Sequence, residues 1–380
     1  MHVALITCGT ISLAAWMYLL FVHGNFWRVA KQPVPARLTT RPTIAVVIPA
    51  RNEADVIARA ITSLLHQQIG ANLHVVLTDD ASTDSTAAVA SQAAETANMA
   101  ASLTILDGQP LPAGWSGKVW AQHQGVAKAL ELNPDYFLLT DADIEHAPDN
   151  LATLVAIAEE QGTDLTSFMV KLHCESWFER WLIPAFVFFF FMLYPPAWIR
   201  DRRRATAGAA GGCMLVRPAA LQKAGGIESI RSEIIDDCAL ASAIKKTGGS
   251  LWLGPTNTAH SIRPYSSISE IGHMISRSAF NQLRHSAPLL MGTLVGLTLL
   301  YFLPIALLFS RSVFTISLGI ATLAAMLIAY TPMILYYRLN LFWALTLPSA
   351  ALFYMGATIH SAVRYWSGAG GMWKGRAQDR

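Results

Sequence analysis

The chain has 380 residues, of which 53% are hydrophobic and only 14% are charged. An ordinary soluble protein has roughly 25% charged residues, so this composition indicates that part of the chain belongs in a membrane. The net charge of +3 gives no nucleic-acid-binding signature. The four cysteines form no CxxC pair, which argues against a zinc site and a disulfide framework.

The first apolar run, from Val3 to Val22, carries no charged residue and is about long enough to span a bilayer. It lacks the basic segment that precedes the core of a cleaved signal peptide. We therefore predict a transmembrane helix within residues 1–26, with a buried core helix as the alternative. Because basic residues follow the run, the positive-inside rule places the next part of the chain in the cytoplasm; these residues are Arg28, Lys31, Arg37 and Arg41.

Residues 40–285 are predicted to form an α/β domain. Short predicted strands at 43–48, 74–78, 103–106 and 136–140 alternate with helical stretches at about 53–65, 83–96 and 118–130. This alternation predicts a mostly parallel sheet with helices on both faces, whose ligands bind at the carboxyl ends of the strands. No GxGxxG or GxxxxGK[ST] motif is present, which argues against a dinucleotide enzyme and a P-loop protein.

Polar residues follow the first two predicted strands. The first group is suited to cradle a nucleoside and consists of Pro49, Arg51, Asn52 and Glu53. After the second strand, Asp80 can accept a hydrogen bond from the imide of a nucleobase, while the segment Ser82–Asp84 can cap the next helix. Capping alone is the simpler interpretation, but it does not explain the two further acids, Asp79 and Asp80.

Asp141-Ala142-Asp143 follows the fourth predicted strand. In an extended chain, residues i and i+2 project to the same side, so both carboxylates can face one cation. Mg²⁺ and Mn²⁺ prefer such oxygen ligands and complete their shell with substrate phosphates. Lys118, in the segment Gly114-Trp-Ser-Gly-Lys118 before a predicted helix, can supply positive charge to a phosphate near the helix N-terminus.

Two later motifs point to an acceptor side. Asp236-Asp237 lies at a predicted helix start beside apolar residues, where a carboxylate can deprotonate an acceptor hydroxyl. The alternative is helix-terminal charge favoured by the dipole. Gly211-Gly212 precedes the apolar run 213–216 and permits close approach of an acceptor, or forms a bulge or turn.

The C-terminal region, residues 286–363, contains apolar runs at 287–309, 313–337 and 341–363, each long enough to span a membrane. Three crossings would leave the basic tail 364–380, with Arg364, Lys374, Arg376 and Arg380, outside the cytoplasm. That conflicts with the positive-inside rule unless one run is re-entrant or interfacial. A further apolar stretch, 183–199, contains Pro195-Pro196 and precedes several arginines, and it is predicted to lie on the membrane surface or to be a buried helix.

The order of these motifs from Pro49 to Asp237 resembles the family 2 inverting glycosyltransferases of the GT-A fold. The resemblance implies that Asp141 and the first two motifs hold the nucleotide, that Asp143 binds a divalent cation (Mg²⁺ or Mn²⁺), and that Asp237 is the catalytic base beside Asp236. The expected partners are a nucleotide-sugar donor, a lipid acceptor and the bilayer, with no nucleic acid. The implied location is the bacterial inner membrane, with several crossings and a catalytic domain that faces the cytoplasm.

Strings such as PLPAGWSGK, LLTDADIEHAPDNL and AGGCMLVR further resemble the hopene-associated glycosyltransferases of bacterial hopanoid gene clusters. This likeness implies a hopanoid or polyprenoid acceptor and partners from the same pathway. The QxxRW motif of many membrane family members is absent, although Arg277 or Arg284 can still meet the diphosphate. His260 can be an additional phosphate or metal contact, but it is more simply a packed strand residue. A nucleotidyltransferase and a catalytically inactive membrane scaffold are the alternative functions.

Overall fold

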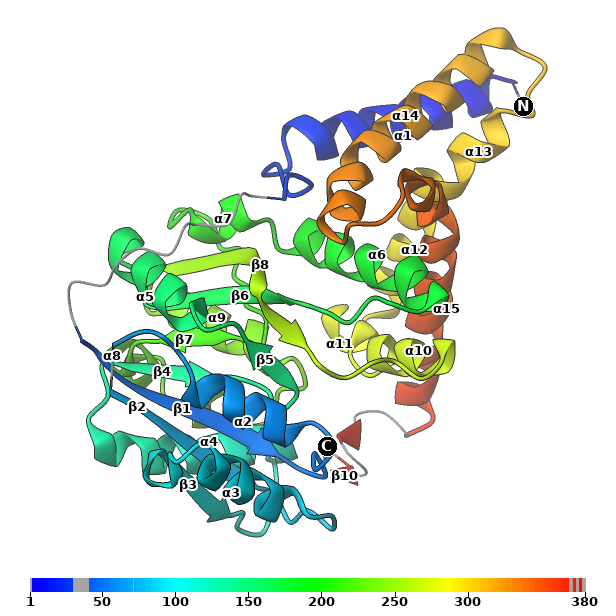
Figure 1. Ribbon diagram of the computed structural model, residues 1–380. Coiled ribbons are helices and arrows are strands. Elements are labelled where there is room, and N and C mark those ends of the chain that lie inside the picture. Colours follow the sequence, from blue (N-terminus) through cyan, green and yellow to red (C-terminus); the bar gives the residue numbers. More distant parts are fainter. Residues whose placement is uncertain (1, 30–40, 71, 369–371, 374–375, 378–380) are drawn as a thin grey trace. The chain divides into compact units, whose positions relative to one another are not determined.

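The computed structural model describes residues 2–29, 41–70, 72–368, 372–373 and 376–377. Lys31, Arg37, Lys374 and Arg380, which entered the topology prediction, lie outside these residues. The chain divides into two compact units (Figure 1). We call them the sheet unit (Ala30–His173, Trp198–Pro264 and Gly371–Arg380) and the helical unit (Met1–Val29, Cys174–Ala197 and Tyr265–Gly370).

The sheet unit contains an eight-stranded sheet in the order β3-β2-β1-β4-β7-β6-β8-β5. The pairings make β7 and β5 antiparallel to their neighbours, while the other strands run in one direction. The predicted α/β class with a mostly parallel sheet is therefore confirmed. The strands are β1 (Thr43–Ala50), β2 (Asn72–Asp79), β3 (Leu103–Asp107), β4 (Tyr136–Leu139), β5 (Ile144–His146), β6 (Leu165–Lys171), β7 (Met214–Val216) and β8 (Leu251–Ser261).

Helices cover both faces of this sheet, as the alternating side chains of β1 show. Ile44, Val46 and Ile48 join a buried cluster with residues of α2 and α5. On the opposite face, Val47 packs so tightly against α4 that a Cβ on Gly125 would lie 2.6 Å from it. The helices of this unit are α2 (Ile57–Leu65), α3 (Thr86–Thr96), α4 (Gly117–Ala129), α5 (Asn150–Gln161), α8 (Pro218–Lys223) and α9 (Asp236–Lys246). A separate pair of short strands, β9 (Met372–Trp373) and β10 (Arg376–Ala377), is antiparallel.

The helical unit contains α1 (His2–Phe21), α6 (Trp177–Leu193), α10 (Ile268–Ser276), α11 (Ala279–Gln282), α12 (Ala287–Leu297), α13 (Leu303–Leu307), α14 (Val313–Tyr336) and α15 (Leu347–Trp366). A short helix, α7 (Pro196–Arg200), spans the chain boundary between the units. Between α12 and α13, residues Thr298–Phe302 form a π-helix. Ser12 and Trp16 of α1 donate to the Leu299 and Leu300 carbonyls there, at 2.7 and 3.0 Å.

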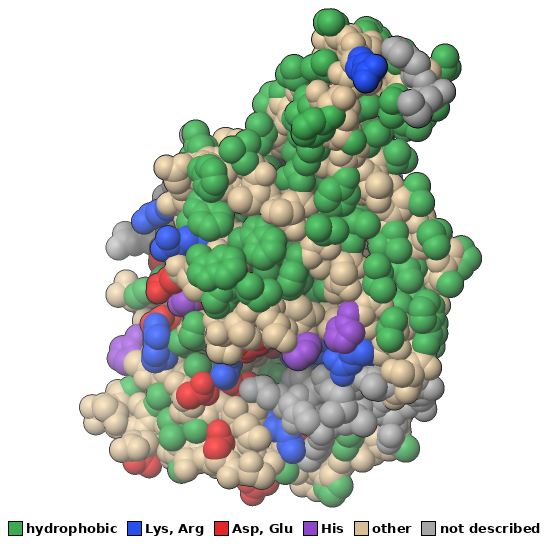
Figure 2. Space-filling view, turned by 90° about the vertical axis from the view of Figure 1, so that its right-hand side faces the viewer, with side chains coloured by type: hydrophobic (Ala, Val, Ile, Leu, Met, Phe, Trp, Pro, Cys, Tyr) green, Lys and Arg blue, Asp and Glu red, His purple; other side chains and the backbone are tan. Residues whose placement is uncertain are grey.

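Five helical segments of the described chain are long and apolar enough to cross a membrane: Val3–Phe21, Trp177–Arg200, Ala287–Leu307, Val313–Tyr336 and Leu341–Trp366. Many of their Leu, Val, Ile and Phe side chains are exposed, and hydrophobic side chains cover much of the face drawn in Figure 2. Such exposed apolar area indicates contact with lipid or with another protein, and together with the length of these helices it indicates membrane association.

Two features of the helical unit differ from expectation. The predicted run 287–309 is interrupted by the π-helix. The stretch predicted at 183–199 is divided between α6, which begins earlier, at Trp177, because Ser176 and Glu179 form a capping box, and α7. The membrane-surface location of this stretch stays a prediction, as do the exact domain boundaries.

Candidate functional site

The topology of the sheet unit gathers the predicted motifs at one edge. β1, β2 and β4 are parallel, so the residues that follow them share their carboxyl edge. β7 runs the opposite way, with Met214 paired to Leu139, and Gly211-Gly212 before it therefore lies beside the motif that follows β4. Thr140, at the end of β4, fixes this approach because its hydroxyl donates to the Gly212 carbonyl at 2.7 Å.

A buried histidine, His146, holds the side chain of Thr140 in place. His146 Nε2 lies 3.1 Å from the Thr140 hydroxyl, and Asn150 Nδ2 lies 2.9 Å from His146 Nδ1. Burial, assisted by the nearby His260, lowers the pKa of His146 to about 3, so its ring is neutral at physiological pH. A neutral ring can donate from Nε2 to Thr140 and accept at Nδ1 from Asn150. This group was not predicted from the sequence.

The segment after β1 is tied to the segment after β2. Asn52 has a positive φ of 53°, its backbone N–H donates to the Ser82 hydroxyl at 2.9 Å, and its side-chain oxygen accepts from the Thr83 N–H at 2.8 Å. Arg51 donates to the Asp80 and Ala81 carbonyls. Pro49 lies within β1, opposite Thr78. These residues brace the two loops against each other, and a direct contact with a nucleoside stays a prediction.

The acids after β2 are also placed by local structure. Asp80 is buried, with its carboxylate 3.7 Å from the Arg51 guanidinium. Asp79 accepts a hydrogen bond from the Ser82 N–H at 3.0 Å. Asp84 accepts from the Thr86 N–H at 3.0 Å in the first turn of α3. Part of the motif therefore serves turn and helix geometry, as the simpler interpretation of the sequence proposed.

Lys118, in the first turn of α4, joins the two predicted halves of the site. Its Nζ lies 2.8 Å from Asp141 Oδ1 and 3.2 Å from Asp236 Oδ2, and its side chain is 20% exposed. Burial alone would lower the pKa of Lys118, but the charges of Asp141, Asp236 and Asp237 raise it well above its ordinary value. Lys118 is therefore a permanent cation between these carboxylates.

Asp237 is held by backbone groups at the start of α9. Gly211 N–H donates to its Oδ2 at 2.8 Å, and Cys238 N–H donates to its Oδ1 at 2.7 Å. Burial and then the charge of Asp236 raise the pKa of Asp237 to about 6, against the opposing effects of Lys118 and these two hydrogen bonds. A carboxylate whose pKa approaches neutrality is a better proton acceptor than an ordinary surface aspartate.

Asp143 has a partner that sequence reasoning missed. Arg263 follows β8, and its Nε lies 3.8 Å from Asp143 Oδ2. The pairing of β5 with β8 brings the two together, since the Ile262 N–H donates to the Asp143 carbonyl at 2.8 Å. Arg263 also contacts Glu53 and Asp55. Its position after a strand end, like that of the predicted residues, marks it as a polar residue at a loop of the sheet, but only the β5–β8 pairing places it beside Asp143.

The donor set for a divalent cation is small. Within the described residues, no group of three or more His, Cys, Asp or Glu side chains is placed to hold a metal by itself. Burial and then the charges of Asp141 and Glu53 raise the pKa of Asp143 to about 6, against the opposing charge of Arg263. Two carboxylates fit a Mg²⁺ or Mn²⁺ ion that completes its coordination with substrate phosphates.

Four candidates remain: His260, Trp115, Arg277 and Arg284. His260 is on β8, as expected, but its side chain is exposed rather than packed. Trp115 packs edge-on against Trp120 and at a tilt against His123. Arg277 and Arg284 belong to the helical unit, so a role at the diphosphate stays a prediction.

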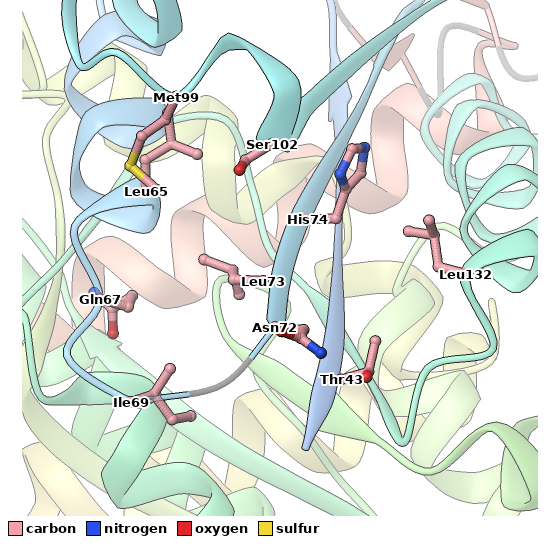
Figure 3. A pocket seen from close by; sticks show the side chains of 10 residues that line it. All are labelled: Thr43, Leu65, Gln67, Ile69, Asn72, Leu73, His74, Met99, Ser102 and Leu132. Atoms are coloured by element: carbon pink, nitrogen blue, oxygen red, sulfur yellow. The ribbon is translucent and has the colours of Figure 1, made fainter. Parts of the chain in front are cut away.

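A cavity of about 430 Å³ lies at the opposite edge of the sheet. Its lining includes Thr43 and Asn72, the first residues of β1 and β2, and Ser102, just before β3 (Figure 3). Ligands of such sheets bind at the carboxyl ends of the strands, so this amino-end cavity is not the candidate site.

Comparison with known proteins shows what the chain is similar to. Residues 45–225 match the family "Glycosyl transferase family 2". Residues 45–225 are thus similar to a family 2 glycosyltransferase domain, and the matched range contains the motifs from Pro49 to Gly212. The chain as a whole resembles a mannosyltransferase from Pyrobaculum calidifontis that was solved in complex with GDP-Man and Mn²⁺. The likeness covers 96% of this chain and 99% of the other. The TM-score of 0.54 at 19% identity shows a shared GT-A-type fold.

Two curated relatives are undecaprenyl-phosphate 4-deoxy-4-formamido-L-arabinose transferases. The protein from Enterobacter sp. (strain 638) is 26% identical over 140 residues, which cover 36% of this chain and 39% of the relative. The protein from Edwardsiella ictaluri (strain 93-146) is 26% identical over 140 residues, with 36% and 40% covered. The chain therefore spans about two fifths of the length of these relatives. The narrower likeness to hopene-associated enzymes stays a prediction.

Proposed function

We propose that this protein is a membrane-bound glycosyltransferase that moves a sugar from a nucleotide-diphosphate sugar to a lipid hydroxyl, with inversion at the anomeric carbon. The observation that carries the proposal is the position of Lys118, whose ammonium contacts both Asp141 and Asp236. A single cation thereby joins the motif suited to the diphosphate with the acidic pair suited to the acceptor.

In this mechanism Asp237 accepts the proton of the acceptor hydroxyl as its oxygen attacks the anomeric carbon. The hydroxyl oxygen forms the new glycosidic bond, and the bond to the diphosphate breaks on the opposite face. Lys118 stabilises the negative charge that develops on the departing diphosphate. Asp143 and Asp141 would hold a Mg²⁺ or Mn²⁺ ion, which supplies Lewis-acid stabilisation of the same charge when bound.

The acceptor class follows from the charge around Asp237. The curated relatives are transferases whose printed names specify undecaprenyl phosphate, which supports a polyprenoid-type lipid. A phosphate acceptor is already an anion and needs no base, and the adjacent carboxylates of Asp236 and Asp237 would repel it. A neutral hydroxyl needs the base and meets no such repulsion. We therefore favour a hydroxyl-bearing hopanoid or polyprenoid lipid.

The proposed setting is the bacterial inner membrane, with the sheet unit facing the cytoplasm, where nucleotide sugars are available. The basic residues after the first apolar run support this orientation through the positive-inside rule. Other enzymes of hopanoid synthesis are the proposed protein partners.

The test is an assay of the purified protein in lipid nanodiscs with a panel of nucleotide sugars and two acceptor types, a hydroxyl-bearing polycyclic lipid and a polyprenyl phosphate. Release of nucleoside diphosphate together with a new glycolipid is expected with the hydroxyl lipid. Release of pyrophosphate instead would identify a nucleotidyltransferase. No metal-dependent nucleotide binding and no turnover would identify an inactive scaffold, and product formation only on polyprenyl phosphate would refute the hydroxyl assignment.

A further inference from the structure

Arg263 places a fixed positive charge beside Asp143, the carboxylate that is the metal ligand in the proposed function. Its Nε lies 3.8 Å from Asp143 Oδ2. Its guanidinium Nη atoms contact Glu53, as well as Asp55 at 3.0 and 3.3 Å. Glu53 and Asp55 come from the segment after β1, whereas Asp143 precedes β5, so one side chain spans two separate segments.

The three contacts differ in strength. The planar guanidinium forms hydrogen bonds with Glu53 and Asp55, which hold it firmly on the first segment. The contact with Asp143 is longer and is an ion pair without a hydrogen bond. Arg263 is 32% exposed, so its side chain has room to shift toward solvent. The contact with Asp143 is therefore the one that a competing cation can displace.

We propose that Arg263 competes with the divalent cation for Asp143, so that the cation binds well only together with the nucleotide. The inference rests on the proposed function. Two cations that share one carboxylate repel each other, so the presence of Arg263 weakens metal binding to the free enzyme. The phosphates of the donor add negative ligands for the metal and a new anionic partner for the guanidinium, which removes the conflict.

This arrangement makes binding of the metal and of the nucleotide mutually dependent. Because Arg263 lies among Glu53, Asp55 and Asp143 when no donor is bound, free cations do not accumulate at these carboxylates. The protein gains a second phosphate-binding group once the donor arrives, because the guanidinium that leaves Asp143 remains anchored by Asp55 and Glu53. Arg263 is thus a positioning residue for the donor complex.

The test measures Mn²⁺ binding by electron paramagnetic resonance, with the full chain in nanodiscs, first without nucleotide and then with UDP or GDP. Wild type should bind Mn²⁺ weakly alone and more tightly with the preferred nucleotide. Arg263→Gln should bind Mn²⁺ alone about fivefold or more tightly than wild type, the scale usual for coupled sites, and should show a smaller nucleotide effect. Arg59→Gln is the matched control, since Arg59 makes an exposed ion pair with Glu145 and its loss removes the same charge.

Arg263→Lys keeps the charge and is the second variant, to be measured in case Arg263→Gln does not fold. A lysine ammonium cannot span three carboxylates, so the affinity of this variant for Mn²⁺ alone should fall between those of wild type and Arg263→Gln. If wild type shows nucleotide-enhanced binding but neither variant binds Mn²⁺ alone more tightly, this inference is wrong and the proposed function stands. If no protein binds Mn²⁺ under any condition, the proposed metal dependence is wrong, and this inference with it.

Discussion

Replacing Asp237 by asparagine tests the proposed base and the physical cause of its basicity together. In the folded protein, burial and then Asp236 raise the pKa of Asp237 to about 6, whereas an unfolded aspartate has a pKa of about 3.9. At neutral pH, keeping this carboxylate ionised therefore costs the folded state at most about 3 kcal/mol. The amide of an asparagine side chain carries no charge, so the Asp237→Asn variant would avoid that cost. It would also lose one of the two acceptors for the Gly211 and Cys238 N–H groups, a loss that does not depend on pH.

The stability effect should depend on pH in a defined direction. Below about pH 4 the carboxyl is protonated in both the folded and unfolded states, so the difference in melting temperature between wild type and Asp237→Asn should not change with pH there. As the pH rises toward 6, the unfolded state ionises more readily than the folded state, and wild type loses stability relative to the variant. Above about pH 6 the difference should level off, with the variant having gained several degrees relative to wild type in thermal melts of the nanodisc-embedded protein.

The glycosyl-transfer activity of Asp237→Asn, unlike its stability at neutral pH, should fall. We expect Asp237→Asn to lower the rate of glycosyl transfer by about 100-fold or more, because general base catalysis is typically worth that much. Nucleotide binding, measured by calorimetry, should persist. Glu233→Gln is the matched control, since Glu233 is an exposed acid in the same segment. Full activity of Asp237→Asn would refute the base assignment, and a melting difference that does not change with pH would refute the argument from burial.

Three further predictions concern neighbouring residues. Asp236→Asn removes a charge that raises the pKa of Asp237, so the acid limb of the kcat/KM profile should move to lower pH; a shift to higher pH would contradict the charge argument. Asp143→Asn should abolish the stimulation by Mn²⁺ in the transfer assay while the fold is retained by circular dichroism, and unchanged stimulation would exclude Asp143 as a ligand. Gly212→Ala places a Cβ 2.9 Å from Val170 Cγ2. This overpacking should lower the free energy of unfolding by about 1–3 kcal/mol, as measured by denaturant melts. Unaltered stability would show that the Val170 side chain can move away without cost.

Much of the parallel half of the sheet could be predicted because its signals are local. The runs at 43–48, 74–78, 103–106 and 136–140 fall within β1 to β4 or extend one residue past them. The first three are each followed by a loop and a helix, a pattern that needs no long-range information. The parallel order of these strands then places the polar segments at one edge, which is why Arg51, Asp80 and Asp141 were assigned to one region.

The rest of the sheet depends on pairings distant in sequence. β5 has three residues and β8 has eleven, and they meet across more than 100 residues of chain. No periodicity shows which strand β8 joins, so the arrival of Arg263 beside Asp143 could not be derived from the sequence. The same holds for His146, whose role depends on Thr140 and Asn150 being buried with it. Asn52 was assigned to the nucleoside, which stays a prediction; its positive φ and its bonds to the β2 loop give it a bracing role that the sequence did not indicate.

Backbone groups, more than side chains, fix the proposed base. Both oxygens of Asp237 accept N–H groups, one from Gly211 and one from Cys238. A Cβ at residue 211 would lie 3.3 Å from Lys118 Nζ and 3.5 Å from Asp237 Oδ2. Glycine at this position therefore keeps open the space between the ammonium that serves the leaving group and the carboxylate that serves the acceptor. An inverting displacement requires these two functions to act on opposite faces of one sugar, and a methyl group between them would occupy that space.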